Sequence, residues 1–231
     1  MMRLSFEPPW LIADLGAPHR TLGWALNRPG FARASRVVWR EVRDAELTPE
    51  LDVARWLAAE LDRRGLSEAC AMVTSRDLAR HVLRSAEVAG ARADCVATVG
   101  LSNGERVGAR TKVSSAGWGT INVALRISTP LGDGAMVEAL SIAAEARTAA
   151  VMEAALAAGP DRPGGPITGT GTDCLVIAAP PGAGAYAGLH TPVGEAIGRA
   201  VYAAVRAGAD EWWATVGRGA RGGSRGGPRT G

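Results

Sequence analysis

The 231-residue chain is predicted to fold as an α/β (α+β) single-domain sandwich, with a mixed β-sheet packed against several helices. Its length suits one domain. Hydrophobic residues make up 47% of the chain and charged residues 21%, a balance typical of globular proteins. Apolar runs of strand length and segments of helical periodicity are interspersed without strict alternation, which favours a mixed sheet.

The first 42 residues are predicted to form strands and turns, because short apolar runs at 10–13 and 36–42 are separated by prolines and glycines. A helix is predicted over 48–64, with Thr48 as its cap and Pro49 in its first turn. A buried strand at 69–74 follows. Ser75 or Asp77 is expected to cap a further helix through residue 87, and 94–101 is expected to be a strand.

The second half of the chain is more regular. Residues 119–127 alternate with a period of two, as in a strand with one buried face. A long Ala-rich helix is predicted over 135–156, then a strand over 174–179 and a last helix over 192–207. Because apolar residues occur around most of the long helix, we expect it to be buried on most sides.

The chain has a formal net charge of +3, and the excess of positive residues lies at its C-terminal end. Four arginines and no acidic residue lie in 217–231, so residues 1–216 carry a charge of −1. We expect a folded domain over 1–216 and a disordered Gly/Arg-rich tail over 217–231. RNA binding by this tail is the alternative, but no nucleic acid partner is expected.

Three cysteines, Cys70, Cys95 and Cys174, have spacings that fit neither a zinc site nor a disulfide framework, and no histidine spacing supports a metal site. The sequence shows no signal peptide, and no run of about 18 apolar residues that could span a membrane. A soluble, cytoplasmic protein is expected. The sequence leaves its oligomeric state open.

Two carboxylates share a face of the long helix, because Glu138 and Glu145 are about two turns apart. A buried carboxylate there needs a partner or a chemical role. The structural alternative is that Glu145 pairs with Arg126 or Arg147, or accepts backbone hydrogen bonds.

The segment 168–173 combines hydroxyls, glycines and a carboxylate in the order Thr168, Gly169, Thr170, Gly171, Thr172, Asp173. Glycine lets backbone amides approach a ligand, so the segment could hold an anion or the oxyanion of a tetrahedral intermediate. It matches neither a P-loop nor a dinucleotide fingerprint. The alternative is a tight turn or bulge before a strand.

Other candidate residues lie near element ends. His190 precedes Thr191, which caps the last helix, and a neutral imidazole there suits proton transfer. Asn103 is by default a turn residue. Asn122 and Thr120 share one face of the period-two strand, where an inward amide would need hydrogen bonds or would hold a ligand.

Four segments in this order resemble the adenosylcobinamide amidohydrolase family: residues 101–103, 119–122, the helix from 133 to 150, and 168–173 followed by 186–191. The resemblance covers about 95–206 well and 21–42 weakly. It implies hydrolysis of the amide between the aminopropanol arm and the corrin ring, giving adenosylcobyric acid and 1-amino-2-propanol during corrinoid salvage. It implies no cofactor of the protein's own, since the cobalt belongs to the corrinoid substrate.

The residue types fit amide hydrolysis, which needs a base or nucleophile, oxyanion donors and an acid. We predict Asp173 or Glu145 as base and His190 as proton donor or base. Substrate binding is predicted for Asn103, Thr120, Asn122, Thr168, Gly169, Thr170, Gly171, Thr172 and Thr191. A nucleophilic threonine among 168, 170 and 172 is the competing mechanism. A non-catalytic corrinoid- or phosphate-binding module is the alternative function.

Overall fold

The computed structural model describes residues 2–43, 46–48, 50–109, 119–159 and 165–216. Its elements are β1 (Arg3–Glu7), β2 (Trp10–Ala25), β3 (Arg28–Glu41), α1 (Val53–Arg63), β4 (Cys70–Thr74), a 3-10 turn (Leu78–Arg80), β5 (Val82–Val88), β6 (Ala91–Val99), β7 (Gly104–Glu105), β8 (Ile121–Ile127), α2 (Asp133–Ala158), β9 (Gly169–Thr170), β10 (Cys174–Ala179) and α3 (Pro192–Thr215).

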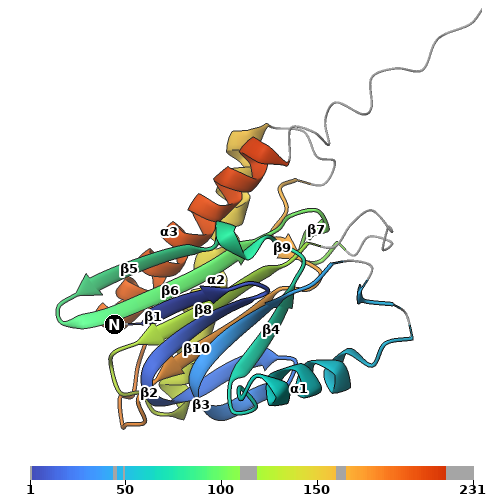
Figure 1. Cartoon of the computed structure of the whole chain (residues 1–231). Helices are drawn as coiled ribbons and strands as arrows, with labels where there is room; N and C mark the ends of the chain where they lie inside the picture. The colour runs from blue at the N-terminus through green and yellow to red at the C-terminus, as the bar shows by residue number, and fades with distance from the viewer. Residues whose placement is uncertain (1, 44–45, 49, 110–118, 160–164, 217–231) are drawn as a thin grey trace, which may run out of the picture.

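One mixed sheet organises the molecule, as predicted (Figure 1). Seven strands run in the order β4-β3-β2-β10-β8-β6-β5, and β1 pairs with the first half of β2. The pairs β8–β10 and β3–β4 are parallel, and the other neighbours are antiparallel. The parallel pairing of β8 with β10 brings the starts of these two strands together, and the candidate site forms there.

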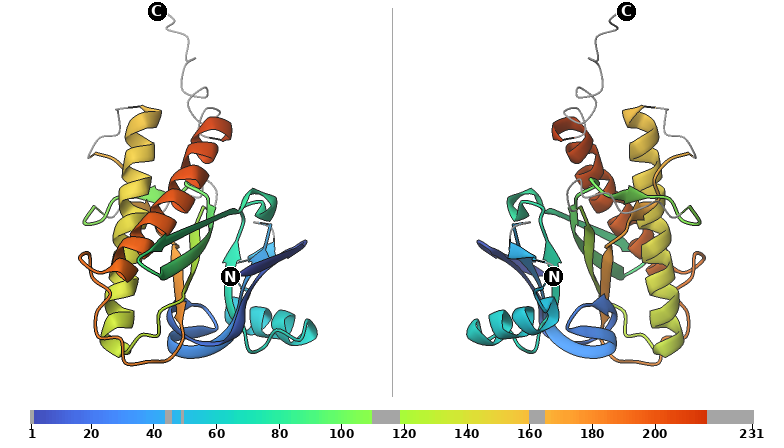
Figure 2. Two further views of the ribbon diagram at one scale, coloured as in Figure 1. Left: turned by 90° about the vertical axis from the view of Figure 1, so that its left-hand side faces the viewer. Right: turned by 90° about the vertical axis from the view of Figure 1, so that its right-hand side faces the viewer.

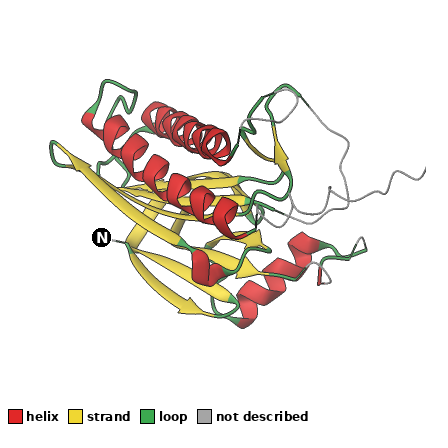
Figure 3. Cartoon of the chain, turned by 90° about the horizontal axis from the view of Figure 1, so that it is seen from above, coloured by secondary structure: helices red, strands yellow, loops and turns green. Residues whose placement is uncertain are grey.

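The long helices α2 and α3 lie side by side over one half of the sheet, while α1 lies at the opposite side of the molecule, outside β3 and β4 (Figures 2 and 3). The first core fills the space between the two long helices and strands β5, β6, β8 and β10. In β10, Leu175 and Ile177 enter this core, while Val176 and Ala178 enter a second core on the other face. This alternation fixes which face each residue of the strand presents.

The second core forms because β2 and β3 are long and bent. The register of β2 against β3 shifts between Asp14 and His19, and Gly16 in this bulge has a φ of 85°. The first half of β2 therefore turns away and packs its apolar side chains against the back of β6, β8 and β10. Helix α1 closes the outer side of β3 and β4 through Leu57 and Leu61.

The helix predicted from Ser75 or Asp77 through residue 87 is wrong. A 3-10 turn at Leu78–Arg80 leads into β5, which pairs with β6 along its whole length. Val82, Ala86 and Val88 pack against the first core at even spacings, the period of a strand. Long-range pairing with β6 therefore decides the conformation of this segment.

Other predicted boundaries hold more closely. Strand β10 spans the predicted residues 174–179, and α2 and α3 each extend past the predicted ends. Helix α1 begins later than predicted, at Val53, with Asp52 rather than Thr48 as its cap. The exposed side of α2 includes Val137, so this helix is buried along one face rather than on most sides. The predicted tail, 217–231, lies outside the described residues.

Candidate active site

The centre of the candidate site is the carboxylate of Asp173, at the start of β10. Its Oδ1 accepts hydrogen bonds from the backbone amide of Ile121 (3.1 Å) and the hydroxyl of Thr170. Its Oδ2 accepts from the backbone amide of Thr170 (3.1 Å) and is paired with the guanidinium of Arg147 from α2. Three separate elements thus hold one carboxylate.

This carboxylate is almost removed from water. The side chains of Asp173 and Arg147 are 7% and 15% exposed. Burial raises the pKa of Asp173 above its usual value, and the nearby Arg147 charge and the hydrogen bonds from Thr170 and Ile121 only partly oppose this effect. A carboxylate with a raised pKa accepts a proton more readily than an ordinary aspartate.

Glycine is required at position 169 because Asp173 and Arg147 leave no room there. A Cβ on Gly169 would lie 2.6 Å from Oδ2 of Asp173 and even closer to the Arg147 guanidinium. A Cβ on Gly171 would meet nothing within 4 Å. The two glycines of the segment therefore differ, and only Gly169 permits the ion pair to form.

A pocket of about 310 Å³ lies beside the ion pair. One wall is the ribbon formed by β7 and β9, in which Glu105 pairs with Gly169. Thr168 strengthens this ribbon by accepting a hydrogen bond from the Val107 amide (2.8 Å). The lining residues are Glu105, Arg106, Val107, Arg147, Thr148, Thr168, Gly169 and Thr170.

Four predicted binding residues brace the segment before β10. The Thr120 hydroxyl lies 2.7 Å from the Thr172 carbonyl and 3.1 Å from Asn122 Oδ1. The Thr172 hydroxyl donates to the Gly119 carbonyl (2.9 Å), and the Asn103 amide reaches that hydroxyl at 3.4 Å.

The side chain of Asn122 is committed to a partner on the other half of the sheet. Its amide donates to the Val73 carbonyl of β4 (2.9 Å). Since Ile121 enters the first core, the next residue, Asn122, faces the opposite side of β8. Asn122 therefore lies across the sheet from the pocket.

His190 and Thr191 lie at the other end of α2. The loop before α3 is tied to Glu138, whose carboxylate accepts from the Ala187 amide (2.6 Å). At 1.5 Å per residue, Glu138 is about 14 Å along the helix axis from Arg147. Thr191 caps α3 by accepting from the Gly194 amide (3.0 Å), and His190 is exposed. Within one copy of the chain, the structure does not bring His190 to Asp173.

Glu145 is exposed and makes a hydrogen bond with Ser141 of the preceding turn (2.9 Å). Neither arginine considered as its partner pairs with it: Arg147 pairs with Asp173, and Arg126 binds the Leu15 carbonyl and Asp94. The expectation that Glu145 is a buried carboxylate is wrong. A helix with an exposed face can carry it at no desolvation cost.

The sequence did not predict two contacts of Asp173: Arg147 was considered only as a partner of Glu145, and Trp24 was not considered. Arg147 lies between Ala143 and Ala150, four and three residues away, on the buried stripe of α2; an arginine in this position of a stripe is a usable signal. Trp24 of β2 donates its indole N–H to the Asp173 carbonyl. Its sequence position gave no such signal, because the contact spans 149 residues.

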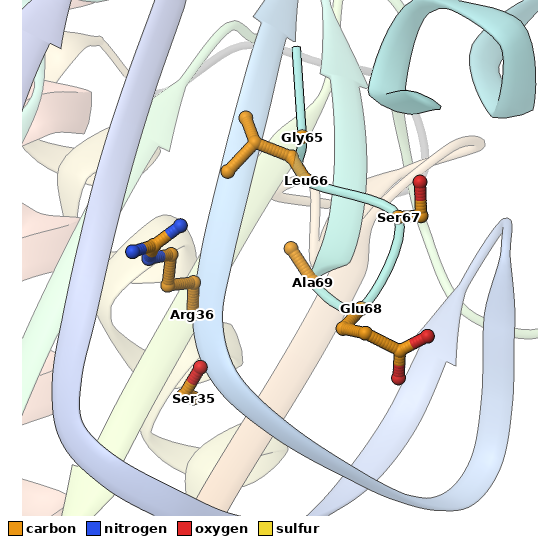
Figure 4. A pocket seen from close by; sticks show the side chains of 7 residues that line it. All are labelled: Ser35, Arg36, Gly65, Leu66, Ser67, Glu68 and Ala69. Atoms are coloured by element: carbon orange, nitrogen blue, oxygen red, sulfur yellow. The ribbon is translucent and has the colours of Figure 1, made fainter. Parts of the chain in front are cut away.

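Two further observations concern the parts of the molecule away from Asp173. Among the described residues, no group of three or more His, Cys, Asp and Glu side chains could hold a metal ion, and none of the helices has the length and apolar character required to cross a bilayer. A second hollow of about 220 Å³ lies between β3 and the loop after α1 (Figure 4). Its charged side chains, Arg36 and Glu68, point to opposite sides, so they converge on no common ligand.

Comparison with known proteins decides the family. A sequence profile of the adenosylcobinamide amidohydrolases (CbiZ) matches residues 1–216. The chain belongs to the adenosylcobinamide amidohydrolase family. The match includes the whole described fold and every residue of the site, and the description of the family implies a hydrolase that acts on an amide.

A relative from Methanocaldococcus jannaschii, an uncharacterised protein, is 40% identical to the chain over 84 residues. This alignment covers 36% of the chain and 32% of the relative, so the chain matches about a third of that protein's length. The assignment of the chain to the adenosylcobinamide amidohydrolase family therefore depends on the match over 1–216.

Proposed function

We propose that the protein hydrolyses the amide of adenosylcobinamide that joins the aminopropanol arm to the corrin ring. The products are adenosylcobyric acid and 1-amino-2-propanol, and the reaction serves corrinoid salvage for cobalamin synthesis in the cytoplasm. The observation that carries the proposal is the hydrogen bond from the Thr170 hydroxyl to the buried Asp173 carboxylate, beside a pocket. A hydroxyl, a base and a third group that orients the base form an activated nucleophile.

The proposed reaction has two stages. In the first, Thr170 Oγ1 attacks the amide carbonyl carbon while Asp173 takes the hydroxyl proton. The C–N bond then breaks, the proton passes to the leaving nitrogen, and 1-amino-2-propanol departs, leaving the corrin acid esterified to Thr170. In the second, water attacks the ester, gives its proton to Asp173, and restores the threonine as adenosylcobyric acid leaves.

Arg147 positions the base. Its guanidinium holds Oδ2, which leaves Oδ1 directed at the Thr170 hydroxyl. Burial raises the pKa of Asp173, which improves it as a proton acceptor. This arrangement favours Thr170 among the three threonines, because its hydroxyl donates to a carboxylate, whereas the hydroxyls of Thr168 and Thr172 donate to backbone carbonyls. The reaction as proposed uses no resident cofactor.

Incubation with adenosylcobinamide followed by mass analysis tests the function. We expect adenosylcobyric acid and 1-amino-2-propanol in equal amounts, and loss of at least about 100-fold in kcat for Asp173→Asn. Thr215→Ala, which removes a hydroxyl at the far end of α3, is the matched control and should keep full activity. A corrinoid that binds but keeps its mass would show a binding module instead.

A second measurement separates the two mechanisms. If Thr170 is the nucleophile, added hydroxylamine captures the ester and yields the hydroxamate of cobyric acid, Thr170→Ala is inactive, and Thr170→Ser keeps part of the activity. If Asp173 instead activates water directly, Thr170→Ala retains turnover and no hydroxamate forms.

A further inference from the structure

The pocket beside Asp173 is too small to enclose the whole of the proposed substrate. Pockets that bury most of a drug-sized ligand measure roughly 300–1,000 Å³, and this one measures about 310 Å³. A corrinoid is far larger than such ligands. The pocket can therefore take only the amide arm, and the macrocycle must lie on the protein surface outside it.

The β2–β3 hairpin, which contacts Asp173 through Trp24, carries two exposed aromatic side chains. Trp24 is 44% exposed although its indole N–H is fixed to the Asp173 carbonyl. Phe31, on β3, is 48% exposed and is the cross-strand partner of Leu22. Because Leu22 enters the first core and Trp24 is two residues further along, Trp24 and Phe31 share the face of the hairpin that is next to α2.

This aromatic pair is held rigidly. At the turn of the hairpin, the Asn27 side chain donates to the Ala69 carbonyl and accepts from the Ala71 amide, both at 2.9 Å. The guanidinium of Arg20 lies 5.2 Å from the centre of the Phe31 ring and is itself paired with Asp133 of α2. A surface fixed in advance loses little conformational freedom on binding.

We propose that Trp24 and Phe31 form a platform on which the conjugated corrin macrocycle lies while its amide arm reaches Asp173. This inference rests on the proposed function and adds to it the residues that select a large flat substrate. Trp24 and Phe31 lie on neighbouring strands, two residues apart along the strand direction. Their backbones are therefore separated by about 7 Å along the strands and about 5 Å between them. An extended ring can cover both, whereas an amide fragment without the ring contacts neither.

Binding of cobyric acid tests the platform without requiring hydrolysis, because this corrinoid has the ring but lacks the aminopropanol amide that is cleaved. We expect Trp24→Ala to raise its dissociation constant, measured by equilibrium dialysis and corrinoid absorbance, by roughly 10-fold, the effect of losing one aromatic stacking partner. The KM for adenosylcobinamide should rise by a similar factor with kcat almost unchanged. Phe31→Ala should act in the same direction.

Two control variants isolate the stacking. Leu83→Ala removes an exposed apolar side chain of β5, at an edge strand of the sheet, and should change neither constant. Trp24→Phe loses the bond to the Asp173 carbonyl but keeps an aromatic face. It should therefore keep most of the affinity for cobyric acid. If Trp24→Phe lowers kcat with KM unchanged, Trp24 is a positioning residue and the platform is refuted.

The remaining outcomes separate this inference from the proposed function. Cobyric acid bound in a Trp24-dependent way without hydrolysis of adenosylcobinamide supports the platform and contradicts the proposed function. Hydrolysis of adenosylcobinamide that is unaffected by Trp24→Ala and Phe31→Ala supports the proposed function and refutes the platform. If these variants instead turn an oligomer into a monomer and leave cobyric acid binding unchanged, the aromatic face binds a second copy of the chain and the platform is refuted.

Discussion

Replacing Gly169 by alanine tests whether the Arg147–Asp173 pair is needed for activity. The added Cβ would lie 2.6 Å from Asp173 Oδ2. Non-bonded carbon contacts are most favourable near 3.5 Å, so the carboxylate would have to recede by about 1 Å. Three further hydrogen bonds restrain Asp173, from the Ile121 and Thr170 amides and the Thr170 hydroxyl. The Arg147 guanidinium would lie even closer to the added Cβ, and its side chain lines the adjoining pocket. We therefore expect the carboxylate to shift within its remaining hydrogen bonds, the Arg147 side chain to retreat into the pocket, and the ion pair to break.

The expected consequences can be measured separately. Misplacing a catalytic group by 1 Å costs roughly 100-fold in rate, so kcat/KM of Gly169→Ala should fall by about that factor. Loss of one charged hydrogen bond should lower the free energy of unfolding by about 2 kcal/mol, which leaves a folded protein. Gly171→Ala is the matched control, since its Cβ meets no atom within 4 Å. A folded Gly169→Ala with the same kcat/KM as Gly171→Ala would refute the requirement for the pair.

Three further predictions concern titration and the distant histidine. Burial raises the pKa of Asp173, so on acidification kcat should begin to fall at a higher pH than it would for an ordinary aspartate. Because the Arg147 charge lowers this pKa, Arg147→Met should move the acid limb of the pH–rate profile to higher pH. A profile that does not move would contradict the assignment of Asp173 as the base. At Asp94, burial raises the pKa, but hydrogen bonds from Ser85, the Met2 amide and Arg92 outweigh it, so the folded pKa is lowered. The stabilisation by Asp94 is therefore present at neutral pH and lost as pH falls below about 4. In urea unfolding, Asp94→Asn should be less stable than the wild type by about 2 kcal/mol at pH 7 and by less at pH 3. An equal difference at the two pH values would refute this reasoning. His190→Ala should keep its kcat, because the exposed imidazole lies at the far end of α2; a large loss would show that His190 reaches the site of another copy.

Local patterns predicted most of the elements. Strand β10 was predictable from six apolar residues bounded by turn signals, and α3 from Thr191 and Pro192 at its start. The same reasoning failed for β5, where polar residues hid the even spacing of Val82, Ala86 and Val88. That strand exists because β6 supplies its hydrogen-bond partners, and pairing between strands is not encoded in either segment alone.

The candidate site shows the same division. The pattern of threonines and glycines before β10 identified Asp173 and Thr170 as candidates from residue chemistry alone. It could not supply Arg147 or Trp24, which approach Asp173 from 26 and 149 residues away along the chain. It also grouped Asp173 with Asn122, Glu145 and His190, which the fold distributes over the opposite face of the sheet, the exposed side of α2 and its far end.

The sequence by itself determined the family, through a match that extends over residues 1–216. It also determined the mixed α/β class, the long alanine-rich helix and the segment from Thr168 to Asp173, because each element is specified by residues close together in the chain. Only the tertiary structure decided which hydroxyl faces the carboxylate, which arginine pairs with it, and that Gly169 leaves room for that pair while Gly171 does not. The physical reason is that the parallel pairing of β8 with β10, and the packing of α2 on β9 and β10, fix distances between atoms that local sequence does not constrain.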